Sequence, residues 1–115
     1  MKKTAYVLAM ITCSSRREAL KIKKVLLEER KVACINIIPK VESFFWWKGK
    51  IDSCLEVLIL AKTKSNNLEE IITLVKKIHS YEVPEIIASP IIGGNKEYLK
   101  WINESLGCPK RKKRK

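Results

Sequence analysis

Cys13 and His79 are the two side chains in this sequence with the clearest potential for chemistry. A thiolate and an imidazole form a soft-to-borderline ligand pair, which favours copper or zinc over calcium or magnesium. Cys13 ends an apolar run, and His79 ends an apolar helical stripe. The pair predicts a divalent transition-metal site, with Cu²⁺ as the first choice and Zn²⁺ as the second. Because metal sites usually have three or four protein ligands, the alternative is that Cys13 is a core residue and His79 closes a helix.

A second candidate site consists of polar and aromatic side chains around one apolar strand. Glu56 and Lys62 interrupt that strand, and their even separation places them on one face with Leu58 and Leu60. Charges on such a strand usually pair or face a cleft. Two interpretations stay open: an ion pair at a subunit boundary, or a polar pocket lined by Glu56, Lys62, Tyr81, Glu85 and Trp101.

The residue patterns do not indicate an enzyme. A Cys-His nucleophile pair needs a third orienting residue, and none is recognisable beside Cys13 and His79. The pair Gly93-Gly94 fits neither a phosphate-binding loop nor a dinucleotide fingerprint. We therefore expect a protein without catalytic activity and without an organic cofactor.

Hydrophobic periodicity divides the chain into four strands and three helices. The strands are expected at 4–12, in the two arms of 31–64, and at 85–89. The helices are expected from 15 to about 30, from 67 to 79, and from 95 to near 107. Ser15 and Glu18 form a capping box at the first helix, and Asn67 and Asn95 are expected to cap the other two.

The order β-α-β-β-α-β plus a terminal helix predicts an α+β fold, the ferredoxin-like sandwich. In that arrangement the last strand returns beside the first strand and runs antiparallel to it. The end of the first strand then lies next to the end of the second helix. Topology alone therefore brings Cys13 and His79 together.

The stretch 31–64 predicts a β-hairpin that is too long for its own domain. Its arms meet at Lys48-Gly49, where Gly49 can adopt a positive φ. Pro39 cannot donate a ladder hydrogen bond, so the first arm is expected to be an edge strand or to be bulged there. The tip carries Phe44, Phe45, Trp46 and Trp47, and side chains alternate between the two faces of a strand. Some of these aromatic rings need a partner surface, which predicts self-association.

Composition indicates one domain with a basic tail. The chain has 115 residues, 46% hydrophobic, and a net charge of +12. Residues 110–115, KRKKRK, are six consecutive basic residues and supply half of that net charge. We expect a folded domain over 1–109 and a disordered tail over 110–115, with weak, nonspecific polyanion binding through the tail.

The cysteines and the hydropathy indicate a cytoplasmic protein. The four cysteines have no zinc spacing, and with a turn at 48–49 Cys34 is expected opposite Thr63 and Cys54 opposite Ser43. They are therefore predicted to be free thiols in a reducing compartment. The start of the chain imitates a short signal peptide, but its removal would delete the first strand. No run approaches the length of a membrane span.

Several short motifs follow one another in order along residues 4–106. They are Ala33-Cys34-Ile35-Asn36 with Pro39, Trp47-Lys48-Gly49-Lys50, Glu56, Lys62-Thr63, His79 to Glu85, and Tyr98-Leu99-x-Trp101-Ile102. In this combination the chain resembles the CutA family of divalent-cation tolerance proteins. The resemblance implies a cytoplasmic, ferredoxin-like homotrimer assembled through extended hairpin strands that include Phe45, Trp46, Trp47 and Gly49. It also implies tolerance to copper and other divalent ions, with Cys13 and His79 at the positions assigned to copper. Ile78 stands where some members carry a second histidine, and Ser80 replaces the usual proline.

The leading functional hypothesis is therefore a CutA-like homotrimer that binds copper or another divalent transition metal and takes part in the response to metal ions. The alternative is a trimeric small-molecule sensor or signalling scaffold that uses a polar pocket between subunits.

Overall fold

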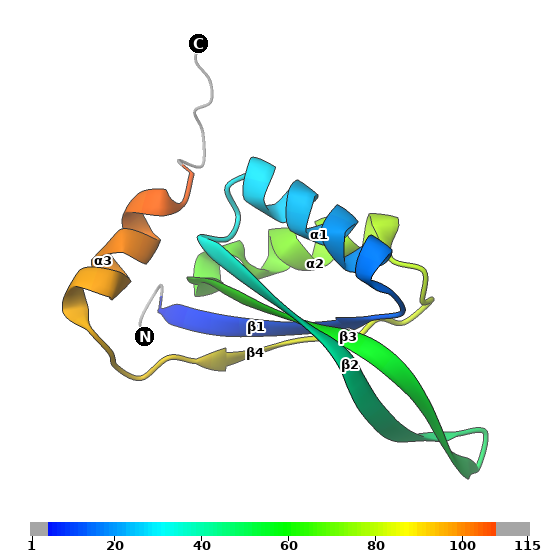
Figure 1. Cartoon of the computed structure of the whole chain (residues 1–115). Coiled ribbons are helices and arrows are strands. Elements are labelled where there is room, and N and C mark those ends of the chain that lie inside the picture. Colours follow the sequence, from blue (N-terminus) through cyan, green and yellow to red (C-terminus); the bar gives the residue numbers. More distant parts are fainter. Residues whose placement is uncertain (1–4, 108–115) are drawn as a thin grey trace.

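A computed structural model describes residues 5–107 (Figure 1). In chain order its elements are β1 (Tyr6–Cys13), α1 (Arg16–Glu28), β2 (Cys34–Trp47), β3 (Lys50–Lys64), a short 3-10 turn (Ser65–Asn67), α2 (Leu68–Ile78), β4 (Ile86–Pro90) and α3 (Lys96–Ser105). The predicted basic tail and Cys108 lie outside the described residues.

The four strands form one antiparallel sheet in the order β2-β3-β1-β4. Helices α1 and α2 lie side by side on one face of this sheet, and α3 lies beside its edge (Figure 1). The predicted α+β fold class is confirmed. The last strand pairs with β1 and runs antiparallel to it, as the sequence predicts.

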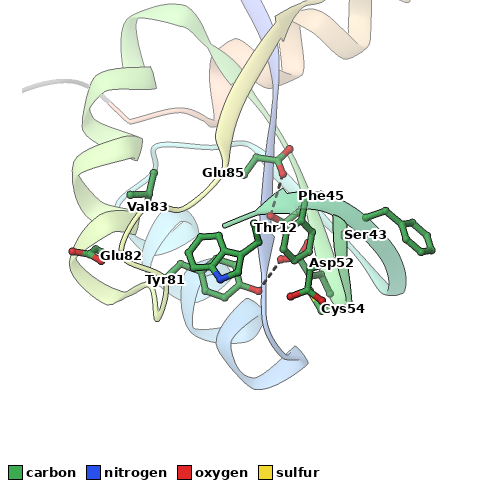
Figure 2. Close-up of a pocket in the computed structure, with 12 residues that line it drawn as sticks. Thr12, Ser43, Phe45, Asp52, Cys54, Tyr81, Glu82, Val83 and Glu85 are labelled. Carbon is green, nitrogen blue, oxygen red and sulfur yellow. Dashed lines mark hydrogen bonds between the residues drawn. The ribbon is translucent and has the colours of Figure 1, made fainter. Parts of the chain in front are cut away.

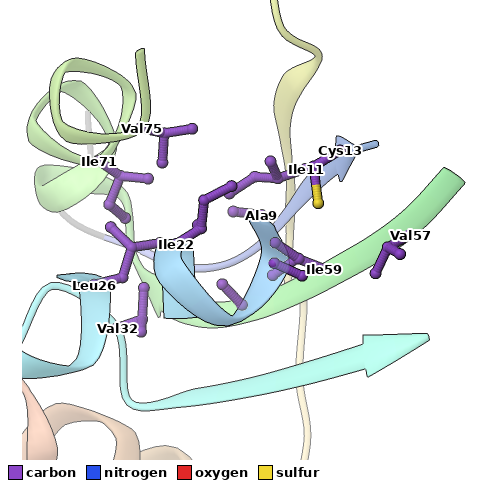
Figure 3. Close-up of a cluster of buried hydrophobic side chains, with 12 residues drawn as sticks. Ala9, Ile11, Cys13, Ile22, Leu26, Val32, Val57, Ile59, Ile71 and Val75 are labelled. Atoms are coloured by element: carbon purple, nitrogen blue, oxygen red, sulfur yellow. The ribbon is translucent and has the colours of Figure 1, made fainter. Parts of the chain in front are cut away.

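The hydrophobic core fills the space between the sheet and the helices α1 and α2 (Figure 3). Alternate residues of β1 and β3 point into it because the side-chain period of a strand is two. The helices contribute one apolar stripe each. The core side chains are Ala9, Ile11, Cys13, Ala19, Ile22, Leu26, Val32, Val57, Ile59, Ala61, Ile71 and Val75.

The opposite face of the sheet is apolar as well, although no helix among residues 5–107 covers it. The side chains of Met10, Leu58 and Leu60 alternate with core residues, and each stays partly exposed in the single chain. Ile87 is 52% exposed on the neighbouring strand, where it pairs with Met10. We call these four residues the open sheet face.

The hairpin of β2 and β3 projects beyond the rest of the sheet. Strand β1 pairs only with residues 57–64 of β3, so the hairpin from Val41 to Glu56 lacks a neighbouring strand (Figure 1). The structure extends 48 × 33 × 26 Å. Its radius of gyration is 15.2 Å, whereas a compact chain of this length has one of about 13 Å. The predicted excess length of the hairpin is confirmed.

A β-bulge at Pro39 and Lys40 shifts the register of the hairpin. Two residues of β2, Pro39 and Lys40, face one residue of β3, and Lys40 has a φ of 61°. Beyond the bulge Cys54 pairs with Ser43, as predicted. Cys34 pairs with Lys62 instead of the predicted Thr63, because the extra residue in β2 displaces the register by one.

Lys48 and Gly49 form the turn, with φ values of 51° and 79°. Two positive φ values in succession define the type I′ turn that suits a two-residue hairpin. We expect Gly49→Ala to lower the free energy of unfolding by about 1 kcal/mol, because a Cβ is strained at positive φ. Urea unfolding at one fixed protein concentration measures this difference. Gly93→Ala is the matched control, since a Cβ there meets nothing within 4 Å and φ is not positive; equal losses in both variants would contradict the expectation.

The three predicted N-cap positions are confirmed, and two of these residues cap their helix through a side-chain hydrogen bond. The Ser15 hydroxyl accepts the amide of Glu18, and the Asn95 carboxamide accepts the amides of Glu97 and Tyr98. Asn67 is the N-cap residue of α2, but its side chain makes no capping hydrogen bond; its amide donates to the Lys31 carbonyl and to the Thr63 hydroxyl instead. Asn67 therefore ties the start of the hairpin to its end. Among residues 5–107, no helix has the length and hydropathy that a membrane crossing requires.

Candidate functional site

The structure places His79 against the end of β1, as the topology predicts. Its Nε2 lies 2.8 Å from the Thr12 carbonyl oxygen, and the Tyr81 amide donates to its Nδ1 over 3.0 Å. Because a carbonyl can only accept, Nε2 carries the proton and Nδ1 is the acceptor. Both ring nitrogens are thus engaged by backbone groups, and His79 is the residue that ends α2.

Cys13 is fully buried in the core, and its thiol donates to the Ser15 carbonyl at 3.5 Å. Burial, followed by the negative charge of Glu18, raises the pKa of Cys13 to about 11. Only the thiolate is a good metal ligand. At neutral pH this sulfur therefore stays protonated.

These two side chains do not fit a transition metal in the described conformation. A bound ion would have to remove the proton from a buried thiol and take a ring nitrogen from its backbone partner. No group of three His, Cys, Asp or Glu side chains among residues 5–107 is placed to hold an ion. The structure supports the alternative, in which Cys13 is a core residue and His79 fastens the end of a helix.

We expect Cu²⁺ titration to give the same affinity for the wild-type protein and for a Cys13→Ala, His79→Gln double variant. Glutamine keeps one donor and one acceptor at position 79, so that the backbone contacts have a substitute. Cys34 and Cys54 are accessible and remain in both proteins, so any copper that they bind contributes equally to both titrations. A loss of affinity of about tenfold or more in the double variant would show that Cys13 and His79 do bind copper.

Glu18 is the residue at this place that sequence reasoning underestimated. Its carboxylate accepts four hydrogen bonds, from the amides and the hydroxyls of Ser14 and Ser80. The capping box indicated that Glu18 reaches backwards, but the long-range contact to Ser80 has no local signal. Ser80 supplies an amide proton here, which a proline could not do. The carboxylate therefore fastens the start of α1 to the segment that follows α2.

The second predicted site is partly assembled at the base of the hairpin. The Tyr81 hydroxyl donates to Glu56 at 2.7 Å, and the Thr12 hydroxyl donates to Glu85 at 3.3 Å (Figure 2). Burial, then the bond to Glu56, raises the pKa of Tyr81, which keeps its hydroxyl protonated. Glu56, Tyr81 and Glu85 thus share one site.

Lys62 and Trp101 lie elsewhere in the chain. The Lys62 ammonium donates to the Asn36 carboxamide oxygen and lies 3.7 Å from the Cys34 sulfur, near the start of the hairpin. Trp101 stacks on Tyr98 along α3, with ring centroids 5.4 Å apart. Within one chain these two residues therefore do not line the same site as Glu56, Tyr81 and Glu85, and a pocket between subunits stays a prediction. The predicted interaction of Glu56 with a cation has no counterpart among residues 5–107.

A cavity of about 820 Å³ lies between the base of the hairpin and the segment that leads into β4. Figure 2 shows Phe45, Asp52 and Cys54 on the hairpin side, with Tyr81 and Glu85 facing them. The lining residues are Thr12, Ser43, Phe44, Phe45, Trp47, Asp52, Cys54, Glu56, Tyr81, Glu82, Val83 and Glu85.

The fold and these sites define a class of small α+β domains, with both central helices on one side of an antiparallel sheet and a central hairpin that outreaches the sheet. Residues 7–105 match the family model described as CutA1 divalent ion tolerance protein. The chain belongs to the CutA1 family.

Individual relatives agree with this assignment. The divalent-cation tolerance protein CutA of Archaeoglobus fulgidus is 47% identical over 96 residues, covering 84% of this chain and 93% of the relative. The solved structure of the divalent cation tolerance protein (Cut A1) from Thermus thermophilus superposes with a TM-score of 0.86 at 41% identity, covering 89% of this chain and 99% of that one. The Danio rerio protein named CutA homolog is 37% identical over 99 residues, covering 86% of this chain and 66% of the relative. The chain spans between half and two thirds of the length of the vertebrate relatives it matches.

Proposed function

We propose that this protein is a non-catalytic homotrimer of ferredoxin-like subunits that takes part in tolerance to divalent metal ions. Membership of the CutA1 family supports the link to divalent ions. The observation that carries the proposal of assembly is the open sheet face. The proposal assigns no metal to Cys13 and His79, because their donor atoms are occupied.

The open sheet face supports assembly because it is a central apolar surface that stays exposed to water in a single chain. A domain normally buries each apolar face of a sheet against another layer. Burying a side chain such as Leu58 or Leu60 stabilises by about 1.5–3 kcal/mol. A second copy of the chain supplies the missing layer.

The hairpin offers a further apolar surface for the same purpose. Phe44 and Trp46 share a face of β2, and Ile51 and Leu55 lie on the same side of β3 because they pair with Trp46 and Glu42. These four side chains are 63–73% exposed. Exposed contiguous apolar patches of this kind mark interaction sites. We call these four residues the hairpin patch.

Two different apolar surfaces favour a closed ring over a pair. The open sheet face and the hairpin patch lie on different parts of the chain, so a contact between one and the other is head-to-tail. Head-to-tail contacts generate rings when the rotation closes. In a ring of three subunits, each open sheet face contacts the hairpin patch of one neighbouring subunit.

The function is tested by growth of a cell strain that lacks its own member of the family. We expect expression of this chain to restore growth in elevated Cu²⁺, and expression of an assembly-deficient variant at the same level to fail. A Cys13→Ala variant should restore growth as well as the wild type. Restoration by single chains, or no restoration by the wild type, would contradict the proposal.

The cavity at the base of the hairpin favours a second candidate function, the small-molecule sensor or scaffold. Its volume lies within the range of ligand pockets, which is about 300–1,000 Å³. A thermal-shift screen separates the two candidates, because a ligand that binds the folded state raises the midpoint of unfolding. The sensor predicts stabilisation by an organic compound and none by a metal ion.

A further inference from the structure

We propose that one end of the layer formed by α1 and α2 binds the phosphate backbone of double-stranded DNA. The inference goes beyond the proposed function and holds for any number of subunits. It starts from five exposed basic side chains on these two helices, which we call the basic end. They are Arg16, Arg17, Lys21, Lys76 and Lys77.

The path of the two helices brings these five residues to the same end of the layer. Helices α1 and α2 lie side by side (Figure 1). Ser80, which follows α2, donates its amide to Glu18 in the first turn of α1. Lys31, which follows α1, pairs with Glu70 in the first turn of α2. The helices are therefore antiparallel, and the start of α1 lies beside the last turn of α2, which carries both lysines of the basic end.

The positive charge of the basic end is not neutralised within the described part of the chain. None of its five side chains forms an ion pair among residues 5–107. Glu18 is the acid in the first turn of α1, but it is 8% exposed and its carboxylate accepts hydrogen bonds from Ser14 and Ser80. The exposed acids of the two helices lie at the opposite end of the layer; they are Glu28, Glu29, Glu69 and Glu70.

Arg16 and Arg17 stand where a helix disfavours positive charge. Both lie in the first turn of α1, beside the partial positive charge of the helix N-terminus, where acids stabilise a helix. Each guanidinium group is also repelled by the other cations of the basic end. A row of phosphates over this surface would offset the repulsion with attraction.

The absence of aromatic rings from this surface selects a duplex. Within residues 5–107, Leu27 is the only large apolar side chain of α1 and α2 that is exposed, and the exposed rings lie on the hairpin and on α3. Single strands bind by stacking their bases on aromatic rings, and a helix on a membrane surface buries a broad apolar face. A DNA duplex needs neither, because its bases are stacked inside and its phosphates are outside.

The dimensions of the surface and its position also suit a duplex. The axes of packed helices lie about 8–10 Å apart, between the widths of the minor and major grooves of DNA, about 6 and 12 Å. Cations on α1 can thus face the phosphates of one strand while cations on α2 face those of the other. The layer covers the side of the sheet opposite the open sheet face, so the basic end stays accessible in the proposed homotrimer.

The test is fluorescence anisotropy of a labelled DNA duplex of about 20 base pairs, titrated with the full-length protein at several salt concentrations. The double variant Lys21→Gln, Lys77→Gln removes one charge from each helix and should weaken binding by about tenfold or more at low salt. The slope of log affinity against log salt concentration should fall by about 1.8, because each lost phosphate contact contributes about 0.9.

The matched control is the double variant Lys96→Gln, Lys100→Gln. It removes the same charge from exposed positions of α3 and should weaken binding by less than about threefold. Residues 110–115 are present in all three proteins, so any binding through the basic tail contributes equally. Circular dichroism and the mass in solution establish that each variant is folded and assembled as the wild type is. Equal losses in the two double variants, or no binding of the duplex by the wild type, overturn the inference.

Two further ligands test the choice of partner. We expect a single strand of the same length to bind more weakly than the duplex. We also expect vesicles of phosphatidylcholine with phosphatidylserine to bind the wild type and the Lys21→Gln, Lys77→Gln variant alike. Tighter binding of the single strand, or a loss of vesicle binding in this variant with the duplex affinity unchanged, contradicts the assignment to double-stranded DNA. None of these results affects the proposal of a homotrimer, which the mass in solution tests separately.

Discussion

Replacing Leu60 by lysine is expected to convert the assembled protein into single chains. Leu60 lies in the middle of the open sheet face, paired with Met10 on one side and with Asn36 on the other. In the single chain it is partly exposed, so a lysine there can reach water. In an assembly that covers the face, the ammonium group would be buried without a partner, at a cost of several kcal/mol per subunit. Light scattering coupled to gel filtration should show the mass falling to about one third.

The control for this variant is Leu27→Lys. Leu27 is 38% exposed on α1, and α1 lies on the sheet face opposite to the open sheet face (Figure 1). We expect this substitution to leave the mass unchanged. Circular dichroism should show the helix and strand content of Leu60→Lys unchanged, because the core between sheet and helices does not contain Leu60. An assembled Leu60→Lys protein would place the contact between subunits elsewhere.

Glu18→Ala is expected to lower the free energy of unfolding by about 2–4 kcal/mol. The substitution leaves the amides of Ser14 and Ser80 without their acceptor. Hydrogen bonds to a charged group are worth about 1.5–3 kcal/mol each, and unsatisfied buried donors add to the loss. Glu28→Ala removes a carboxylate from the same helix and should cost less than about 0.5 kcal/mol, since its pair with Lys24 is exposed. Urea unfolding at one protein concentration compares the two.

The contribution of Glu18 to the free energy of unfolding should depend on pH, and the direction of this dependence can be derived. Burial alone would raise the pKa of Glu18, but the hydrogen bonds from Ser14 and Ser80 outweigh burial and hold the pKa below its usual range. A carboxyl with a lowered pKa in the folded state contributes stability above its unfolded pKa, about 4.3. That contribution is lost as the pH falls through the folded pKa. The difference in stability between wild type and Glu18→Gln should therefore be constant near neutral pH and should shrink in acid; a constant difference down to the lowest pH of folding would contradict this origin.

The turn of the hairpin and its bulge were predictable because each has a local signal, whereas the strand order followed from the order of the helices and strands along the chain. A glycine that can adopt a positive φ marks the turn at Gly49, and a missing amide proton marks the bulge at Pro39. The error of one residue at Cys34 has the same cause, since the bulge adds a residue to β2. The position of the bulge was thus predicted from a local signal, but the predicted strand pairing did not take the extra residue into account.

The chemistry of the site was less predictable because it depends on contacts between distant segments. His79 does lie against the end of β1, but nothing local indicates that the Thr12 carbonyl and the Tyr81 amide occupy both imidazole nitrogens. Asn67 has the residue type of a helix cap, yet the Lys31 carbonyl and the Thr63 hydroxyl take its amide. In each case a partner far away in sequence provides the stronger interaction. The even spacing of Glu56 and Lys62 correctly predicted that they share one face of β3. It did not predict that the Lys62 ammonium donates to Asn36, near the start of the hairpin.

The mass of the wild-type protein in solution tests the central proposal most directly. Sedimentation equilibrium across a range of concentrations should give about three times the mass of a single chain, and this mass should persist after dilution. A mass of one chain at all concentrations would contradict the proposal. It would mean that the open sheet face and the hairpin patch remain exposed to water without a partner.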